Sequence, residues 1–143
     1  MFVKQISVFL ENSKGSLSRM TRMISEAGLD LIALSIADTE HYGILRCIVT
    51  DTEKGYQALK DAGYTARLTD VLAVYVPDHP GGLADVLDVL RDESISVEYL
   101  YSFVRSSGSH ALIIFHLDEL ERGAEVLTRK GIRLLDQEQI RSL

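Results

Sequence analysis

The sequence has little of what several classes of function need. Cys47 is the only cysteine, so neither a disulfide framework nor a thiolate metal cluster can form within one chain. Lysine and arginine number 15 against 21 aspartates and glutamates, and the net charge of −6 argues against nucleic-acid binding. The only local basic group is formed by Lys14, Arg19 and Arg22, which a solvated helix face explains.

Long apolar runs are also lacking. No run approaches the length of a transmembrane helix, and the N-terminal residues do not form the apolar core of a signal peptide. The hydrophobic content of 46% is nevertheless ample for a packed core. We therefore expect a soluble, cytoplasmic protein with no membrane partner.

The side chains that would make an enzyme do not gather in the sequence. A catalyst needs a nucleophile with its base, a carboxylate pair or a metal site. His110 and His116 would lie about 20 Å apart on one strand, too far to share a metal. His79, beside Asp78, could bind a metal or transfer a proton, but recognition of a ligand is the favoured interpretation. Cys47 lies in an apolar strand and is expected to be an inert core thiol. We predict no enzymatic activity and no cofactor.

An internal duplication organises the chain. Positions of the first half match positions 66 residues later, as Asn12 matches Asp78. The apolar register follows the same offset without a gap, which marks two copies of one unit. The matched apolar pairs include Leu17 with Leu83, Met20 with Val86, Ile24 with Leu90 and Leu29 with Ile95.

Apolar periodicity predicts six elements in each copy. In the first copy, strands are expected at 3–10, 29–37, 42–50 and 64–68, and helices at 17–27 and 52–62. In the second copy, strands are expected at 71–76, 95–103, 110–117 and 132–135, and helices at 83–92 and 119–130. The order strand-helix-strand-strand-helix-strand is the ferredoxin-like βαββαβ plan, an antiparallel sheet with two helices on one face. We predict an α+β fold with two such units, 1–69 and 70–143.

Each copy carries a loop between its first strand and its first helix, at 12–17 and at 78–83. Glycines in these loops let a ligand approach the backbone, and the start of a helix offers unpaired N–H groups with a partial positive charge. Such a loop suits a carboxylate or a phosphate. The alternative is a capped strand-to-helix turn that binds nothing.

The two loops resemble the Asp/Asn-x-Pro-Gly-x-Leu loop of ACT domains, and the resemblance covers essentially the whole chain, twice. ACT domains have the βαββαβ fold, are regulatory modules of amino-acid metabolism and bind amino acids at domain interfaces. The chain resembles stand-alone tandem ACT proteins that carry no catalytic domain. The first loop departs from the pattern because Lys14 stands where the family usually has proline, which puts the equivalence of the two loops in question.

The resemblance implies two ligand sites, each joining the loop of one unit to the start of the second strand of the other unit. One site would join 12–17 with 96–101, and the other would join 78–83 with 30–35. Helix N–H groups would hold an α-carboxylate, while Asn12, Asp30 or Asp78 would accept from an ammonium group. For Asp30, a polar turn residue is the alternative. The implied ligand-binding residues are Asn12, Ser13, Lys14, Gly15, Ser16, Leu17, Asp30, Leu31, Ile32, Asp78, His79, Pro80, Gly81, Gly82, Leu83, Ser96, Val97 and Glu98.

The two implied sites differ in their strand residues. Glu98, Tyr99 and Tyr101 stand beside one site, whereas the other has aliphatic residues. This difference predicts unequal sites. The alternative is that both tyrosines are core or dimer-contact residues.

Two strands are apolar at nearly every position, 44–49 and 111–115. A sheet with one solvated face would show alternation, so we expect the second face of each sheet to be buried as well. Another copy of the chain is the simplest cover. We therefore expect a homodimer with twofold symmetry.

The junction between the copies is only Thr69-Asp70. If the units paired side by side, the strands joined there would be about 29 Å apart, whereas two residues reach about 7 Å. One hypothesis is an exchange of the fourth strands, in which 132–135 pairs with 3–10. The alternative is one long bent strand over 64–76.

Two functions are compatible with these features. The first is a non-catalytic regulatory sensor that binds a free amino acid between its two units and reports it by changing its assembly or its contact with a metabolic enzyme. The second is a ligand-free structural or interaction module that binds and regulates a partner enzyme. Asp78, Pro80, Gly81 and Gly82 together favour the sensor, and Lys14 favours the interaction module.

Overall fold

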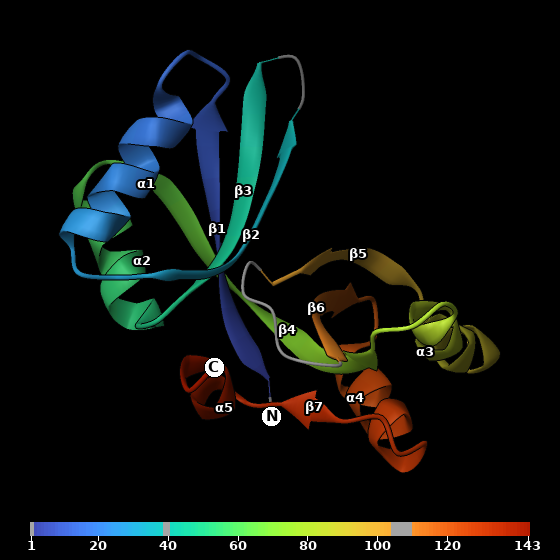
Figure 1. The fold of residues 1–143 in the computed structure, drawn as a ribbon. Coiled ribbons are helices and arrows are strands. Elements are labelled where there is room, and N and C mark those ends of the chain that lie inside the picture. Colours follow the sequence, from blue (N-terminus) through green and yellow to red (C-terminus); the bar gives the residue numbers. More distant parts are fainter. Residues whose placement is uncertain (1, 39–40, 104–109) are drawn as a thin grey trace. The chain divides into compact units, whose positions relative to one another are not determined.

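The computed structural model describes residues 2–38, 41–103 and 110–143 (Figure 1). The chain divides into two compact units. The first unit is Lys4–Thr69, and the second unit is Asp70–Leu143 together with the first residues of the chain through Val3. Strand β4 (Thr65–Pro77) runs from the first unit into the second.

The first unit is an antiparallel sheet with two helices on one face (Figure 1). Its strands follow the order β2-β3-β1-β4, and the last position is taken by the first part of β4. The remaining elements are β1 (Val3–Glu11), α1 (Ser16–Glu26), β2 (Leu31–Asp38), β3 (Tyr42–Val49) and α2 (Thr52–Asp61).

Alternation along β1 creates the first core. Ile6, Val8 and Leu10 are buried under the helices, and Met20 and Ile24 of α1 pack against them. The two helix residues are four positions apart and therefore lie on one face of α1. This agreement between the period of two in the strand and the helical spacing confirms the predicted order of elements.

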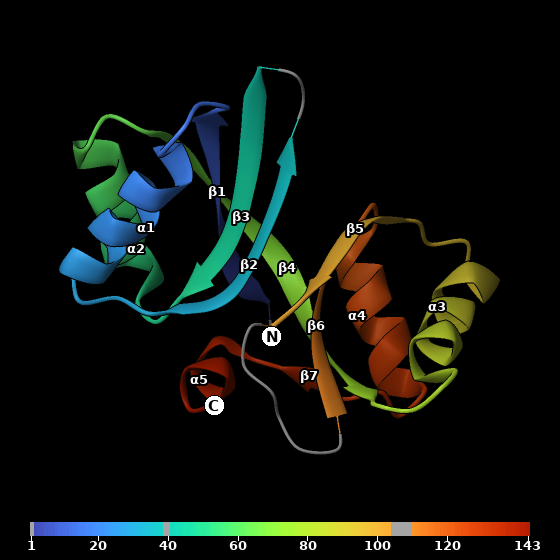
Figure 2. The same cartoon turned by 45° about the horizontal axis from the view of Figure 1, so that its top comes forward.

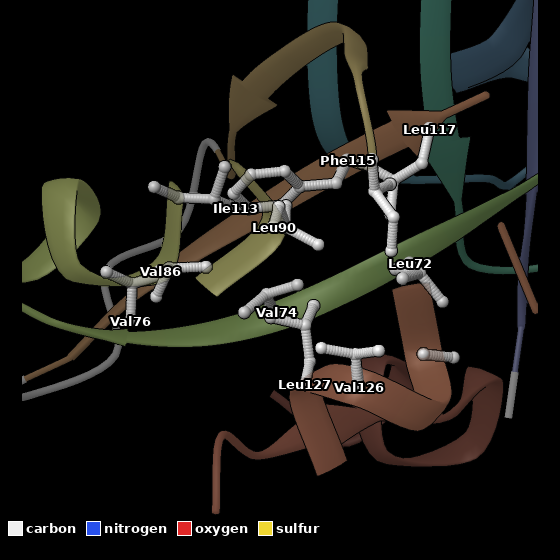
Figure 3. Close-up of a cluster of buried hydrophobic side chains, with 12 residues drawn as sticks. Leu72, Val74, Val76, Val86, Leu90, Ile113, Phe115, Leu117, Val126 and Leu127 are labelled. Carbon is white, nitrogen blue, oxygen red and sulfur yellow. The ribbon is translucent and has the colours of Figure 1, made fainter. Parts of the chain in front are cut away.

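The second unit repeats this plan (Figure 2). Its sheet has the order β7-β4-β6-β5, and α3 and α4 lie on one face. The side chains of α3 and α4 meet those of β4 and β6 in a second core (Figure 3). The elements besides β4 are α3 (Gly82–Asp92), β5 (Val97–Ser102), β6 (His110–Leu117), α4 (Leu120–Arg129), β7 (Leu134–Leu135) and α5 (Gln137–Arg141).

The predicted exchange of the fourth strands is wrong. In β7, Leu135 lies opposite Ala73 and Leu134 opposite Val74, so β7 pairs with β4 of its own unit. Strand β1 lies beside β4. Thr69 and Asp70 continue β4 without a turn, as the alternative of one long strand required. The exchange would have required a tight hairpin turn at Thr69 and Asp70, and neither residue is favoured in such a turn. A strand that continues through the junction needs no reversal of the chain and keeps its backbone groups hydrogen-bonded.

The two strands with little alternation have buried side chains on both faces. In β3, Cys47 belongs to the core under the helices, and its neighbour Ile48 is fully buried on the other face. In β6, Phe115 and Ile114 show the same arrangement. The homodimer stays a prediction. Among the residues that the structure describes, no helix is long and apolar enough to cross a membrane.

Candidate functional site

The two strand-to-helix loops have the same backbone hydrogen bonds. In each loop, the second residue donates to the last residue of the preceding strand, and the fifth residue donates back to the second. The bonds are Ser13 N–H to Glu11 O (2.9 Å) and Ser16 N–H to Ser13 O (3.2 Å) in the first loop, and His79 N–H to Pro77 O (3.0 Å) and Gly82 N–H to His79 O (3.0 Å) in the second.

A glycine in the left-handed region begins both helices. Gly15 has φ 82° and ψ −4°, and Gly81 has φ 88° and ψ −8°. Residues with a Cβ adopt this conformation at a cost, so glycine is the residue that the turn requires. Lys14, in the proline position of the first loop, does not change this geometry.

Neither helix start is capped by a side chain. The N–H groups of the first turn have no acceptor within an α-helix, and they carry the positive end of the helix dipole. In α1 these groups belong to Leu17 and Ser18, and in α3 to Leu83 and Ala84. Each loop therefore leaves backbone N–H groups at an uncapped helix start, and the binding of an anionic group there stays a prediction.

The residues at the fifth loop position differ in size. A Cβ added to Gly82 would overlap the carbonyl oxygen of Pro77, so the second loop is tight enough to demand glycine there. At the matching position, Ser16 is buried and its Oγ lies 2.6 Å from Oγ of Ser13. Arg19 reaches back from the next turn, and its Nη2 donates to Ser16 Oγ at 3.5 Å. The fifth loop position therefore lies against a backbone carbonyl in the second loop, whereas in the first loop its hydroxyl pairs with that of Ser13.

The charges around the two loops are opposite in sign. Lys14 and Arg19 are exposed at the first loop, and α1 has no acidic residue in its first turn. The second loop has Asp85 in the first turn of α3, followed one turn later by Asp88, which pairs with Arg91 at 3.2 Å. The first loop therefore favours an anion more strongly than the second.

A hollow of about 240 Å³ lies beside the first loop, within the first unit. It joins the end of β1 and the start of α1 to the chain between α2 and β4. Sequence reasoning missed this hollow, because it assigned Arg19 to a solvated helix face and could not bring residues 63–65 to the loop. The lining residues are Phe9, Leu10, Glu11, Ser16, Arg19, Gly63, Tyr64 and Thr65.

The predicted strand-start residues are held by backbone bonds at their own sheet edge. Asp30 accepts from the N–H of Thr50 at 3.1 Å and donates its own N–H to Thr50 Oγ1 at 3.2 Å. Ser96 donates its N–H to a carboxylate oxygen of Asp118 at 2.9 Å and accepts from the Asp118 N–H at 3.1 Å. The two strand starts are therefore built alike, as the loops are.

Within each unit, the loop and the strand start lie at opposite ends of the sheet. Asn12 donates to His41 O (3.1 Å) just before β3 begins, whereas Leu31 lies opposite Val49 at the end of β3. The registers of β4 with β6 and of β5 with β6 give the same separation in the second unit. Neither unit therefore brings its own loop and strand start together. The sites predicted to join two units stay predictions.

The polar and aromatic residues of β5 pack against a histidine of β6. Glu98 has a carboxylate oxygen 3.0 Å from Nδ1 of His116. The ring of Tyr99 stacks on the same imidazole, with ring centres 4.9 Å apart, and Tyr101 is buried next to Tyr99. These contacts agree with the packing role that was the alternative for both tyrosines.

The candidate catalytic groups do not meet. Burial raises the pKa of the Cys47 thiol to about 12, so the thiol is protonated and shielded. His79 is exposed, and its Nδ1 lies 3.0 Å from the carbonyl oxygen of Pro80. Among the described residues, no three His, Cys, Asp or Glu side chains gather in a way that could hold a metal ion.

Comparison with known proteins shows which family the chain matches. The family model described as an ACT domain pair matches residues 1–143. Protein BT0572 of Bacteroides thetaiotaomicron is 37% identical and superposes with a TM-score of 0.93, with coverage of 100% of this chain and 98% of that one.

Two further solved structures share the fold at low identity. The ligand-free regulatory subunit of aspartate kinase from Thermus thermophilus gives a TM-score of 0.66 at 14% identity, over 88% of this chain and 91% of that one. The corresponding subunit from Thermus flavus gives 0.63 at 14% identity, over 88% of each chain. No curated protein matches. The match over the whole length shows that the chain belongs to the ACT domain pair family.

Proposed function

We propose that the protein is a non-catalytic regulatory sensor of a free amino acid, which the strand-to-helix loops bind. The observation that carries this proposal is the shared geometry of the two loops, each with a left-handed glycine and an uncapped helix start. A duplicated turn without a ligand would not need to keep both helix starts uncapped, because side-chain caps stabilise helices by about 1 kcal/mol.

Each part of an α-amino acid has a complementary group near a loop. The first-turn N–H groups of α1 or α3 would hold the carboxylate, and Asn12 or Asp78 would accept from the ammonium group. Since a loop and its own strand start lie apart, the remaining contacts would come from the strand start of the other unit. Those residues are 30–32 for the second loop and 96–98 for the first.

A regulatory role is supported by the structural neighbours. The two Thermus proteins are regulatory subunits of aspartate kinase, and they share this fold over most of the chain. By analogy, we propose that ligand binding changes how this protein assembles or how it contacts a metabolic enzyme. A twofold homodimer in the cytoplasm is the assembly that we propose.

The ligand-free interaction module is the second candidate, and one observation favours it. Phe9 and Tyr42 are 44% and 60% exposed on the helix-free face of the first sheet. Exposed aromatic residues of this kind are enriched at protein–protein contacts. A partner protein could bind this face without any amino-acid ligand being present.

A thermal-shift screen against the standard amino acids separates the two candidates. A ligand that binds only the folded protein raises the unfolding temperature in proportion to its occupancy. The sensor proposal expects one amino acid, or a few of related chemistry, to raise this temperature. If none does so at millimolar concentration, the interaction module is the better account.

A further inference from the structure

The second unit ends in a segment that the repeat does not contain. Residues 136–143 correspond by the 66-residue offset to 70–77, which form the later part of β4 instead. The added segment contains the short helix α5. A helix of this length is not stable alone and must be held by its surroundings.

Two contacts hold α5 in place. Asp136 and Gln139 form a reciprocal capping box, in which each side chain bonds to the backbone of the other at 2.9 Å. Ile140 is fully buried. The capping box and the buried side chain therefore hold the segment in one conformation within the second unit.

Helix α5 and β7 line a hollow of about 410 Å³, which lies wholly within the second unit. This volume falls in the range of small-molecule sites, about 300–1,000 Å³. A second hollow of about 370 Å³ adjoins it and shares Arg133 and Leu135. The lining of the larger hollow includes Tyr75, Arg133, Leu135, Glu138, Ser142 and Leu143.

Arg133 is positioned by its neighbours without being neutralised. Its carbonyl oxygen accepts from the N–H of Tyr75 at 2.9 Å, and its guanidinium carbon lies 5.3 Å from the centre of the Tyr75 ring. The ring of Tyr75 is held in turn by a stack on His110, with centres 4.4 Å apart. A guanidinium over an aromatic face keeps its N–H edge available for an anion.

Three other arginines of the second unit have carboxylate partners, whereas Arg141, outside the hollow, has no ion pair among the described residues. Arg91, Arg122 and Arg129 each lie within 3.6 Å of an acidic side chain. Within the part of the chain that the structure describes, Arg133 has no such ion pair, and neither has Glu138 on α5. The lining therefore has one positive side chain, Arg133, and two negative ones, Asp136 and Glu138, of which Asp136 already accepts the capping hydrogen bond from Gln139.

The apolar part of the lining completes the chemistry. The hollow is lined by buried Leu135, by Leu143, which is 40% exposed, and by Tyr75. We propose that this hollow is a second ligand site, separate from the loops, for a small zwitterion such as an amino acid with an apolar side chain. Arg133 binds the carboxylate, Glu138 binds the ammonium group, and the apolar group lies against Leu135 and Leu143.

Amide chemical shifts of the ¹⁵N-labelled full chain test this site. The probes are the standard amino acids at millimolar concentration. For the amino acid that moves the signals of 133–143 most, the probes also include the matching carboxylic acid without the amine and the matching amine without the acid. We expect at least one apolar amino acid to shift these signals. Each single-charge analogue should bind at least about tenfold more weakly, because one charged hydrogen bond is lost.

Variants locate the effect. Arg133→Gln and Glu138→Gln should each weaken binding about tenfold or more. Arg141→Gln is the same change as Arg133→Gln, made on α5 at a residue outside the hollow, and should not weaken binding. Asp78→Ala, which tests the loops, should leave the shifts at 133–143 unchanged. The proposal is overturned if no probe moves these signals, if Arg133→Gln and Arg141→Gln bind alike, or if Asp78→Ala abolishes the shifts.

Discussion

The first loop and the second loop share their backbone hydrogen bonds and a left-handed glycine, but the charges around them are opposite. Gly15 and Gly81 differ by only a few degrees in φ and ψ, yet Arg19 follows one and Asp85 follows the other. The comparison shows that the turn is set by the left-handed glycine and two backbone bonds. The surrounding charge is free to vary, and it decides which ligand group each loop prefers.

The proline of the second loop is not what shapes the turn. Lys14 occupies the matching position of the first loop, where the same hydrogen bonds form at similar lengths. The proline position can therefore tune stability without changing conformation. Three sets of substitutions test whether the two loops are alike, and they follow in order of expected effect.

Gly82→Ala should have the largest effect and should distinguish the two loops. The new Cβ would overlap a backbone carbonyl of Pro77, which has little freedom to move. We expect a loss of about 3 kcal/mol in the free energy of unfolding, the upper end for overpacking, measured by denaturant titration. The matched control is Ser16→Ala, which should cost only about 1 kcal/mol for the lost hydroxyl contact. Equal costs would show that the two loops are not different in tightness.

Gly15→Ala and Gly81→Ala should have the next largest effect, and the effect should be the same in both loops. A Cβ at Gly81 would meet nothing within 4 Å, and one at Gly15 would meet only the flexible end of Arg19 at 3.3 Å. The cost then comes from the left-handed conformation, about 1–2 kcal/mol each. Calorimetric unfolding of both variants measures it. A difference between them larger than the cost itself would contradict the shared backbone.

Lys14→Pro should have the smallest effect and should be stabilising. Because the first loop already has the conformation that Pro80 adopts, proline would restrict the unfolded chain without straining the folded one. We expect a gain of about 0.4–1 kcal/mol, and Pro80→Lys should lose a similar amount. A destabilised Lys14→Pro variant, seen in the same denaturant titration, would show that the first loop departs from the second after all.

The sequence predicted the paired units because several signals agreed. The 66-residue offset, the apolar periods and the loop pattern all indicated the same βαββαβ order, and the family match over the whole chain confirms it. The left-handed conformation of Gly15 and Gly81 comes from the structure, because the sequence had predicted only that loop glycines let a ligand approach the backbone.

Features that depend on distant contacts could not be predicted in the same way. The hollow beside Arg19 needs residues 63–65, which only the folded first unit brings near α1. Helix α5 is too short to show periodicity, although the Asp136-x-x-Gln139 spacing of a capping box was a signal that could have found it. The strand exchange was inferred from an assumed arrangement of the units, and the continuous strand β4 made it unnecessary.

Calorimetric titration of Asp78→Ala measures whether the second loop binds an amino acid. The titrant is the amino acid that gives the largest thermal shift with the wild-type chain. We expect the affinity to fall by about 1.5–3 kcal/mol, the loss of a hydrogen bond to a charged group. The control Asp61→Ala, at the exposed C-terminal end of α2 in the first unit, changes no loop residue and should bind like wild type. An unchanged dissociation constant for Asp78→Ala would contradict binding at the second loop.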